Sequence, residues 1–285
     1  MTMEHSLKVF YNEKQNVINN DSFSPSAGKP KLVVERFKRY PSVEVVSDWP
    51  PLTRVDLYQA HDKSHIDDVL DCKKPNGFSN YSKEVAASLY WTTGSIYNAA
   101  KHAVKFNTVT MSPTSGFHHA TYNESMAFCT FNGLMIALVL LKNEKLINSA
   151  GIIDFDMHYG NGTEDIINKL NIDYLQHIGS SDIIALDEDN TIDRNDLSNK
   201  LNAFKKCSIL LYQAGADPHI NDPLGGKLTT EQMIMRDRLV FTFAKENKIP
   251  LVWNLAGGYQ NPIENVIDLH ENTLKECLSV YKLYE

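Results

Sequence analysis

The chain has 285 residues, of which 42% are apolar and 22% charged, the balance of an ordinary globular protein. Its formal net charge of −7 disfavours a nucleic-acid partner, because phosphate binding needs clustered lysine and arginine. No run of about 18 uncharged apolar residues occurs, so we expect no transmembrane helix, and the polar first residues predict no signal peptide.

Short β-rich runs alternate with longer helical stretches along the chain, and each strand is a near-continuous apolar run. In chain order the pattern predicts helices 31–40, 64–70 and 83–106, strand 108–111, helix 124–146, strand 150–155, helix 163–170, strands 172–178 and 207–213, helix 230–247, strand 250–256 and helix 263–281. This alternation indicates an α/β fold with three layers and a central, mostly parallel sheet.

The segments between these elements show no repeat and no low-complexity linker, so we expect residues 1–285 to form one domain. The polar segments 12–30, 71–81 and 183–196 are predicted to be surface loops. Four cysteines are scattered without a close pair, which argues against disulfides and a cysteine zinc cluster and favours a cytoplasmic location. They are Cys72, Cys129, Cys207 and Cys277.

Polar clusters follow four of the predicted strands. His118 and His119 come after strand 108–111, and Asp154-Phe-Asp156-Met-His158 ends strand 150–155. The other two clusters, after strands 207–213 and 250–256, are Asp217 and Gly257-Gly258-Tyr259. Because ligands of open α/β sheets bind at the carboxyl ends of the strands, we expect these side chains to share one crevice.

Asp156 and His158 alternate along an extended segment, so their side chains leave it on the same side. With Asp217 they would supply two carboxylates and one imidazole, which leaves a coordination position open, as in catalytic zinc sites. The alternative for this motif is a strand-end turn, since Asn161-Gly162 is a common turn signal. Adding Asp217 and the histidine pair favours the metal.

The paired histidines could move protons during hydrolysis. A hydrolytic water needs a base to take its proton, and a departing amine needs an acid, but the spacing does not say which histidine does which. Tyr259 stays protonated at neutral pH and could donate to a developing oxyanion. The alternative is an ordinary loop tyrosine after a glycine turn.

These segments resemble the zinc-dependent histone deacetylase family, which has the arginase/deacetylase fold. The likeness extends over most of the chain from about His61 onward. Within the family the chain is most similar to the class IV branch. The matching motifs are Gly116-Phe-His118-His119-Ala, Phe128-Cys129, Asp154-Phe-Asp156-Met-His158-Tyr-Gly-Asn161-Gly, Ala214-Gly-Ala-Asp217, Asp222-Pro-Leu-Gly-Gly226 and Ala256-Gly-Gly-Tyr259-Gln260, with Ala27-Gly28-Lys29 and Arg236-Asp237-Arg238 as class IV features.

The resemblance implies a role for each motif residue around the metal. Asp156, His158 and Asp217 would hold one catalytic Zn²⁺. Among the remaining polar residues, His119 would be the general base and His118 its electrostatic or acid partner. Asp154 would bond His118 and help to hold a structural K⁺, with carbonyls of Asp156 and His158 and, less firmly, of His177 and Ile178. Asn161 would contact His119 where several family members have aspartate.

The resemblance also implies how a substrate binds. Tyr259, with Gly257 and Gly258, would contact the acyl carbonyl, and Phe128 would line the tunnel for the acyl-lysine stem. Some positions depart from the family: Ala127 replaces a glycine, Tyr159 a second histidine, and segment 71–81 has no clear counterpart of the rim aspartate. Gly160 stands where related two-metal enzymes have a bridging aspartate, which favours a single zinc.

The resulting prediction is a zinc-dependent lysine deacylase acting on acylated lysine side chains of proteins or peptides. The acyl group would be acetyl, with a long-chain fatty acyl group as an extension that needs a hydrophobic pocket. Two alternatives stay open: an acetylpolyamine amidohydrolase with the same reactive groups, and an inactive module that only binds acyl-lysine.

Overall fold

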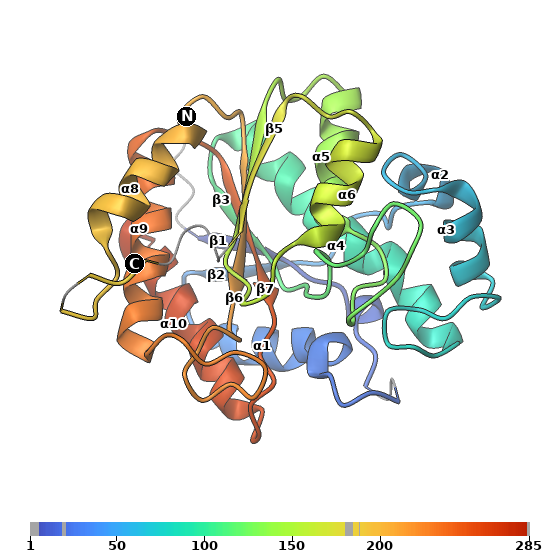
Figure 1. Cartoon of the computed structure of the whole chain (residues 1–285), viewed down its shortest axis with the longest axis horizontal. Coiled ribbons are helices and arrows are strands. Elements are labelled where there is room, and N and C mark those ends of the chain that lie inside the picture. The colour runs from blue at the N-terminus through green and yellow to red at the C-terminus, as the bar shows by residue number, and fades with distance from the viewer. Residues whose placement is uncertain (1–5, 19–20, 180–184, 188, 284–285) are drawn as a thin grey trace.

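The computed structural model describes residues 6–18, 21–179, 185–187 and 189–283. Within these ranges seven parallel strands form one sheet in the order β2-β1-β3-β7-β6-β4-β5 (Figure 1). The α/β fold with a mostly parallel central sheet is confirmed. The strands are β1 (Leu7–Phe10), β2 (Val43–Val46), β3 (Val109–Ser112), β4 (Ala150–Asp154), β5 (Leu175–Gly179), β6 (Leu210–Gly215) and β7 (Leu251–Ala256).

Helices cover both faces of the sheet (Figure 1). One face carries α1 (Lys29–Phe37), α8 (Arg194–Leu201), α9 (Thr230–Glu246) and α10 (Glu264–Tyr281). The other carries α2 (Arg54–Leu57), α3 (Lys63–Leu70), α4 (Lys83–Phe106), α5 (Gly133–Asn143) and α6 (Asn161–Lys169). Short 3₁₀ turns are η1 (Glu13–Gln15), η2 (Pro25–Ala27) and η3 (Asn202–Phe204). None of the described helices is long and apolar enough to cross a membrane.

The central strands are apolar throughout because each face packs against its own helical layer. In β7, Leu251, Trp253 and Leu255 join the core beside α9 and α10, whereas Val252 joins the core beside α4 and α5. All four side chains are fully buried. Burial of a side chain of this size stabilises a fold by roughly 1.5–3 kcal/mol, so the sheet is anchored on both faces.

The first two strands are missing from the sequence prediction. β1 and β2 each have four residues, and their apolar positions are interrupted by Lys8 and Glu44. The two strands pair in parallel with Lys8 opposite Glu44, whose side chains form an ion pair of 2.5 Å. Such short strands at the margin of the sheet give too little pattern to be recognised.

Helix α5 begins at Gly133, nine residues later than predicted. The preceding residues Ala127 and Phe128 have φ of 46° and 65°, a left-handed conformation that interrupts a helix. Asn132 then caps α5 by accepting the N–H of Met135. The residues in between form a loop at the carboxyl end of the sheet instead of a first helical turn.

The predicted loop at 183–196 overlaps a helix. α8 begins at Arg194, and Asp193 caps it by accepting the N–H groups of Asn195 and Asp196. The sequence analysis predicted no helix here because the segment is strongly polar. Residues 183, 184 and 188 of the predicted loop lie outside the described residues, as do 19 and 20 of the loop predicted at 12–30.

Candidate active site

Four neighbouring strands in the middle of the sheet carry the predicted site. β3, β7, β6 and β4 lie side by side, so the segments that follow them meet at one edge. Asp154 is the last residue of β4, and the turn after it carries Asp156 and His158. Asp217 follows β6, and Tyr259 follows β7. The structure therefore brings all the predicted metal and catalytic residues into one neighbourhood.

Asp156, His158 and Asp217 converge on one point, with ligand atoms within 4.8 Å of one another. His158 Nδ1 lies 3.2 Å from Asp156 Oδ1 and 3.1 Å from Asp217 Oδ2. The backbone holds this arrangement, since the His158 N–H donates to Asp156 and the Met157 N–H donates to Asp217. Both carboxylates are buried, and the imidazole is partly open to the cavity.

The charges of this trio suit a divalent cation. Burial raises the pKa of Asp217, and the facing Asp156 carboxylate raises it further, because two anions repel in a place that excludes water. A single imidazole between them offsets this repulsion only in part. Two carboxylate oxygens and one imidazole nitrogen form a donor set that binds Zn²⁺ with a position left open. The residues present thus fit the expected metal.

The two neighbouring histidines have different partners. His118 Nδ1 bonds the buried Asp154 carboxylate at 2.8 Å, whereas His119 Nδ1 bonds the Asn161 amide oxygen at 2.6 Å. Burial opposes a charge on His118, but Asp154 and Asp156 outweigh it and raise its pKa to about 9. Burial and the nearby His118 lower the pKa of His119. One ring is therefore charged and the other neutral near pH 7.

Because Asn161 offers only an oxygen to His119, the ring donates from Nδ1 and keeps Nε2 able to accept a proton. The ring centroids of His118 and His119 are 4.1 Å apart, and that of His158 is 6.0 Å from His119. The base and the metal trio thus face the same small space.

Tyr259 is positioned by the glycine turn before it. Gly257 and Gly258 have φ of 48° and 91°, and a Cβ on Gly257 would lie 2.2 Å from Cγ of Asp217. Only glycine permits this backbone to approach a metal-site carboxylate so closely. The Tyr259 N–H donates to Asp222 at 2.8 Å, and burial raises the pKa of the phenol, which therefore stays protonated.

Three charged residues support the site, although the sequence analysis gave them no role in it. Lys29 is fully buried at the start of α1 and donates to the Gly257 carbonyl; burial lowers its pKa to about 8. Arg236, also fully buried, donates to the Gly215 carbonyl at 3.0 Å. Asp222 holds Tyr259. Lys29 and Arg236 lie in the class IV-like motifs and Asp222 in a motif shared with the whole family, and these motifs were the only signal in the sequence.

Aromatic side chains from separate loops form the rim. The Phe128 ring lies 5.7 Å from that of Tyr259. Phe23 is 74% exposed and its ring lies 5.0 Å from Phe128 and 6.2 Å from Tyr259. Phe78 lies 6.2 Å from Phe128. Phe23 and Phe78 belong to segments predicted only as surface loops; no periodic pattern could have identified them.

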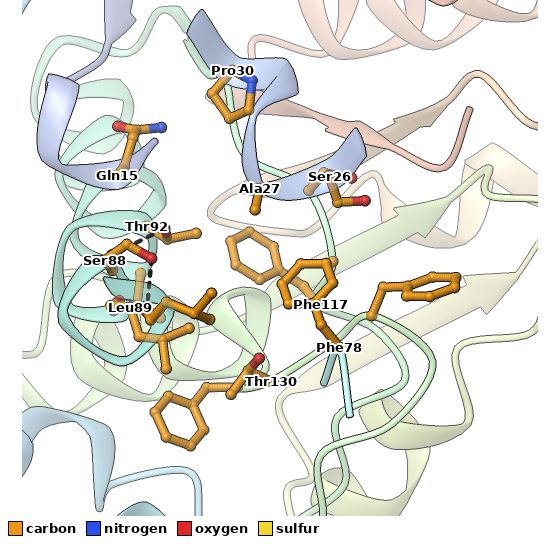
Figure 2. Close-up of a pocket in the computed structure, with 16 residues that line it drawn as sticks. Gln15, Ser26, Ala27, Pro30, Phe78, Ser88, Leu89, Thr92, Phe117 and Thr130 are labelled. Carbon is orange, nitrogen blue, oxygen red and sulfur yellow. Dashed lines mark hydrogen bonds between the residues drawn. The ribbon is translucent and has the colours of Figure 1, made fainter. Parts of the chain in front are cut away.

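The site opens into two small adjoining cavities. The first, about 20 Å³, is lined by both histidines, Asp156, His158, Phe128 and Tyr259. The second, about 40 Å³, shares Phe128 with the first and extends to α4. Figure 2 shows Ser88, Leu89 and Thr92 of α4 on one side of it, facing Ala27 and Phe117. These volumes correspond to one to a few water molecules, so the enclosed space suits a small group.

A family model described as "Histone deacetylase domain" matches residues 26–178, more than half of the chain. The chain belongs to the histone deacetylase domain family. The resemblance stated from the sequence motifs is confirmed at this level, and the residues of these motifs lie together at the carboxyl ends of the strands, as predicted.

Curated relatives agree with this family. "Histone deacetylase 2" of Arabidopsis thaliana is 30% identical over 184 residues, which cover 57% of this chain and 48% of that protein. An uncharacterised protein of Picosynechococcus is 26% identical over 201 residues, covering 64% of this chain and 65% of that one. The aligned part thus spans about half to two thirds of these relatives. A "Probable deacetylase" of Methanothermobacter thermautotrophicus is 42% identical over 52 residues, or 18% of this chain and 16% of that protein.

Solved structures share the histone deacetylase fold. The HDA15 HD domain superposes with a TM-score of 0.73 at 16% identity, covering 96% of this chain and 90% of that one. The acetylpolyamine aminohydrolase from Burkholderia pseudomallei gives a TM-score of 0.72 at 14% identity, covering 96% and 99%. At these identities the likeness concerns the fold, and the two neighbours do not separate protein from polyamine substrates.

Proposed function

We propose that this protein is a zinc-dependent lysine deacylase that hydrolyses acetyl groups from lysine side chains of proteins or peptides. The observation that carries the proposal is the convergence of Asp156, His158 and Asp217 beside His119 and Tyr259 in one cavity. The family is one of deacetylases, and an amide hydrolase needs these groups: a metal trio, a base and an oxyanion donor.

A zinc ion held by Asp156, His158 and Asp217 would supply Lewis-acid chemistry, polarising the acyl carbonyl and lowering the pKa of the hydrolytic water. His119 takes the proton of that water at Nε2, because its Nδ1 is committed to Asn161. The hydroxide adds to the acyl carbon, and the Tyr259 phenol donates to the carbonyl oxygen.

The charged His118 ring, which is hydrogen-bonded to Asp154, stabilises the negative charge that develops on the carbonyl oxygen. When the carbon–nitrogen bond breaks, His119 returns its proton to the departing ε-amine. The products are acetic acid, which ionises to acetate, and the free ε-amine of the lysine side chain. Phe128 and Phe23 form the entrance through which the lysine stem passes to the buried groups.

The finer features of the proposal follow from the same residues. A class IV relationship is supported by Lys29 and Arg236, which lie in the motifs that suggested it and contact the site. The cytoplasm is proposed because all four cysteines are free thiols. We treat residues 1–285 as one catalytic domain, since one sheet carries the site.

The small cavities favour a short acyl group. Their volumes of about 20 and 40 Å³ suit an acetyl group, whereas a long fatty chain would have to displace side chains such as Leu89 and Phe117. Hydroxyl groups of Ser88, Thr92 and Ser115 also line the second cavity, which makes it less suitable for an extended hydrocarbon.

The test compares three substrates with and without metal. The purified protein should release acetate from an acetyl-lysine peptide faster than it releases myristate from a myristoyl-lysine peptide, and faster than it hydrolyses acetylputrescine. Chelation should abolish turnover, and added Zn²⁺ should restore it. Equal turnover after the metal is stripped would exclude the mechanism. A preference for acetylputrescine would indicate a polyamine deacetylase instead. Binding of the acetyl-lysine peptide without turnover would indicate a module that only binds acyl-lysine.

A further inference from the structure

A buried histidine lies behind the site and takes no part in the proposed reaction. His177 comes from β5, and its side chain is 1% exposed. Its Nδ1 bonds Glu164 Oε1 of α6 at 2.6 Å, and its Nε2 lies 3.9 Å from Asp154 Oδ2. The ring therefore stands between two carboxylates, one of which holds His118.

The Asp154 carboxylate is already surrounded by protein groups. Oδ1 accepts the Asp156 N–H at 3.1 Å and the Gln213 amide at 2.8 Å, and Oδ2 accepts His118 at 2.8 Å. His177 Nε2, a buried nitrogen without a hydrogen-bond partner, lies 3.9 Å from Oδ2. A carboxylate has about four lone-pair sites, and protein donors already occupy three of those of Asp154.

These residues do not fit the K⁺ ion that the family resemblance implies beside Asp154. Hard cations are bound by oxygen atoms, but the group that faces Asp154 is an imidazole nitrogen. Space is also short, because a Cβ on Gly160 would lie 2.8 Å from Asp154 Oδ2 and 3.1 Å from His177 Cε1. The two nitrogens of His177 instead face the carboxylates of Glu164 and Asp154. The ring can donate a hydrogen bond to each of them when both nitrogens carry a proton, as in imidazolium.

We propose that the Glu164–His177 pair replaces a potassium ion beside Asp154 and orients this carboxylate toward His118. His177 is then a positioning residue, which acts on His118 through Asp154 and does not touch the substrate. The inference rests on the proposed deacylase site for its catalytic meaning. The replacement itself can be tested without any turnover.

The first experiment measures the zinc-loaded protein in KCl, NaCl and choline chloride at equal ionic strength. The melting temperature and the rate on an acetyl-lysine peptide should be the same in all three salts, because no monovalent site remains to be filled. A rise in melting temperature specific to K⁺ would overturn the proposal, as would a Tl⁺ or Rb⁺ peak beside Asp154 in a soaked crystal.

The second experiment uses Glu164→Gln, which keeps the size of the side chain but removes the charge that anchors His177. Asp173→Asn is the matched control, since it removes an exposed carboxylate just before β5. Glu164→Gln should lower the melting temperature by roughly 2–6 °C and kcat by roughly 10-fold. KM should not change, because neither residue meets the substrate. A Glu164→Gln protein that behaves like the control contradicts the positioning role.

The third experiment uses His177→Ser, which removes the ring and leaves an oxygen and free space beside Asp154. This variant should melt at a lower temperature in choline chloride and should be stabilised by K⁺, which is the response that the wild type lacks. If His177→Ser does not fold, the proposal is still tested by the salt series on the wild type and by the comparison of Glu164→Gln with its control. Failure of the deacylase proposal would be visible separately, as absence of turnover with unchanged melting behaviour.

Discussion

The floor and the rim of the site are built in different ways. The floor comes from the ends of β4, β6 and β7 and consists of charged groups that bond one another, such as the buried carboxylates of Asp156 and Asp217 and the partly exposed ring of His158. The rim comes from loops and consists of aromatic rings in loose contact, such as Phe23 and Phe128. From this contrast we expect the floor to determine the chemistry and the rim to determine which substrates enter.

The largest expected effect is on the floor. Asp217→Asn removes a carboxylate from the metal trio, so zinc binding should be lost and kcat/KM on an acetyl-lysine peptide should fall by on the order of 10³-fold or more. The metal-free variant should melt no lower than the metal-free wild type, because one of two facing buried carboxylates is gone. Metal analysis, rates and melting curves check this; full activity without bound zinc would contradict it.

Tyr259→Phe separates the two parts of the site, since the Tyr259 ring packs near Phe128 at the rim and its hydroxyl is the proposed oxyanion donor of the floor. Loss of one oxyanion donor should lower kcat by about 10²–10³-fold with little change in KM. Tyr81→Phe, at an exposed tyrosine, is the matched control and should keep the wild-type rate. A protein that only binds acyl-lysine would show the same binding in all three forms.

A smaller effect on the floor should appear as a shift in pH dependence. Asn161→Asp places a carboxylate beside His119, which stabilises the imidazolium and raises the pKa of the base, by about one unit at this half-buried position. Since only the neutral ring accepts a proton, the acid side of the kcat/KM profile should move to higher pH by the same amount. An unchanged acid side would mean that His119 is not the base.

The floor could be predicted from the sequence because each group lies within a few residues of a strongly apolar strand. Asp154 to His158 and Gly257 to Tyr259 are continuous motifs, and parallel strands carry such motifs to one edge of the sheet. The residues that support these motifs could not be predicted in the same way. Lys29 lies beside Gly257, and His177 beside Asp154, only in the folded protein, because each pair is far apart in the sequence.

The rim could not be predicted, for conformational reasons. Ala127 and Phe128 adopt positive φ, which side-chain-bearing residues rarely do, so the segment was predicted to be helical. Phe23 and Phe78 lie in polar loops, where a single aromatic residue gives no periodic signal. Similarly, β1 and β2 were not predicted, because each has only four residues and its apolar pattern is interrupted by Lys8 or Glu44.

The smallest expected effect belongs to the rim and concerns binding alone. Phe23→Ala removes an exposed ring that packs edge-on against Phe128, an aromatic contact worth about 0.5–1.5 kcal/mol. A peptide that rests on the Phe23 ring would lose a contact of similar size, so its KM should rise by about two- to ten-fold, with kcat unchanged because no reacting group moves. Phe106→Ala, at another exposed phenylalanine, on α4, serves as the control.

The same variant should leave the rate on acetylputrescine unaltered, because a small amine passes the rim without a peptide backbone to rest on Phe23. A fall in kcat for both substrates would instead mean that Phe23 holds Tyr259 in place across the 6.2 Å between their rings. In that case the rim would be part of the chemistry, and the division between floor and rim would have to be abandoned.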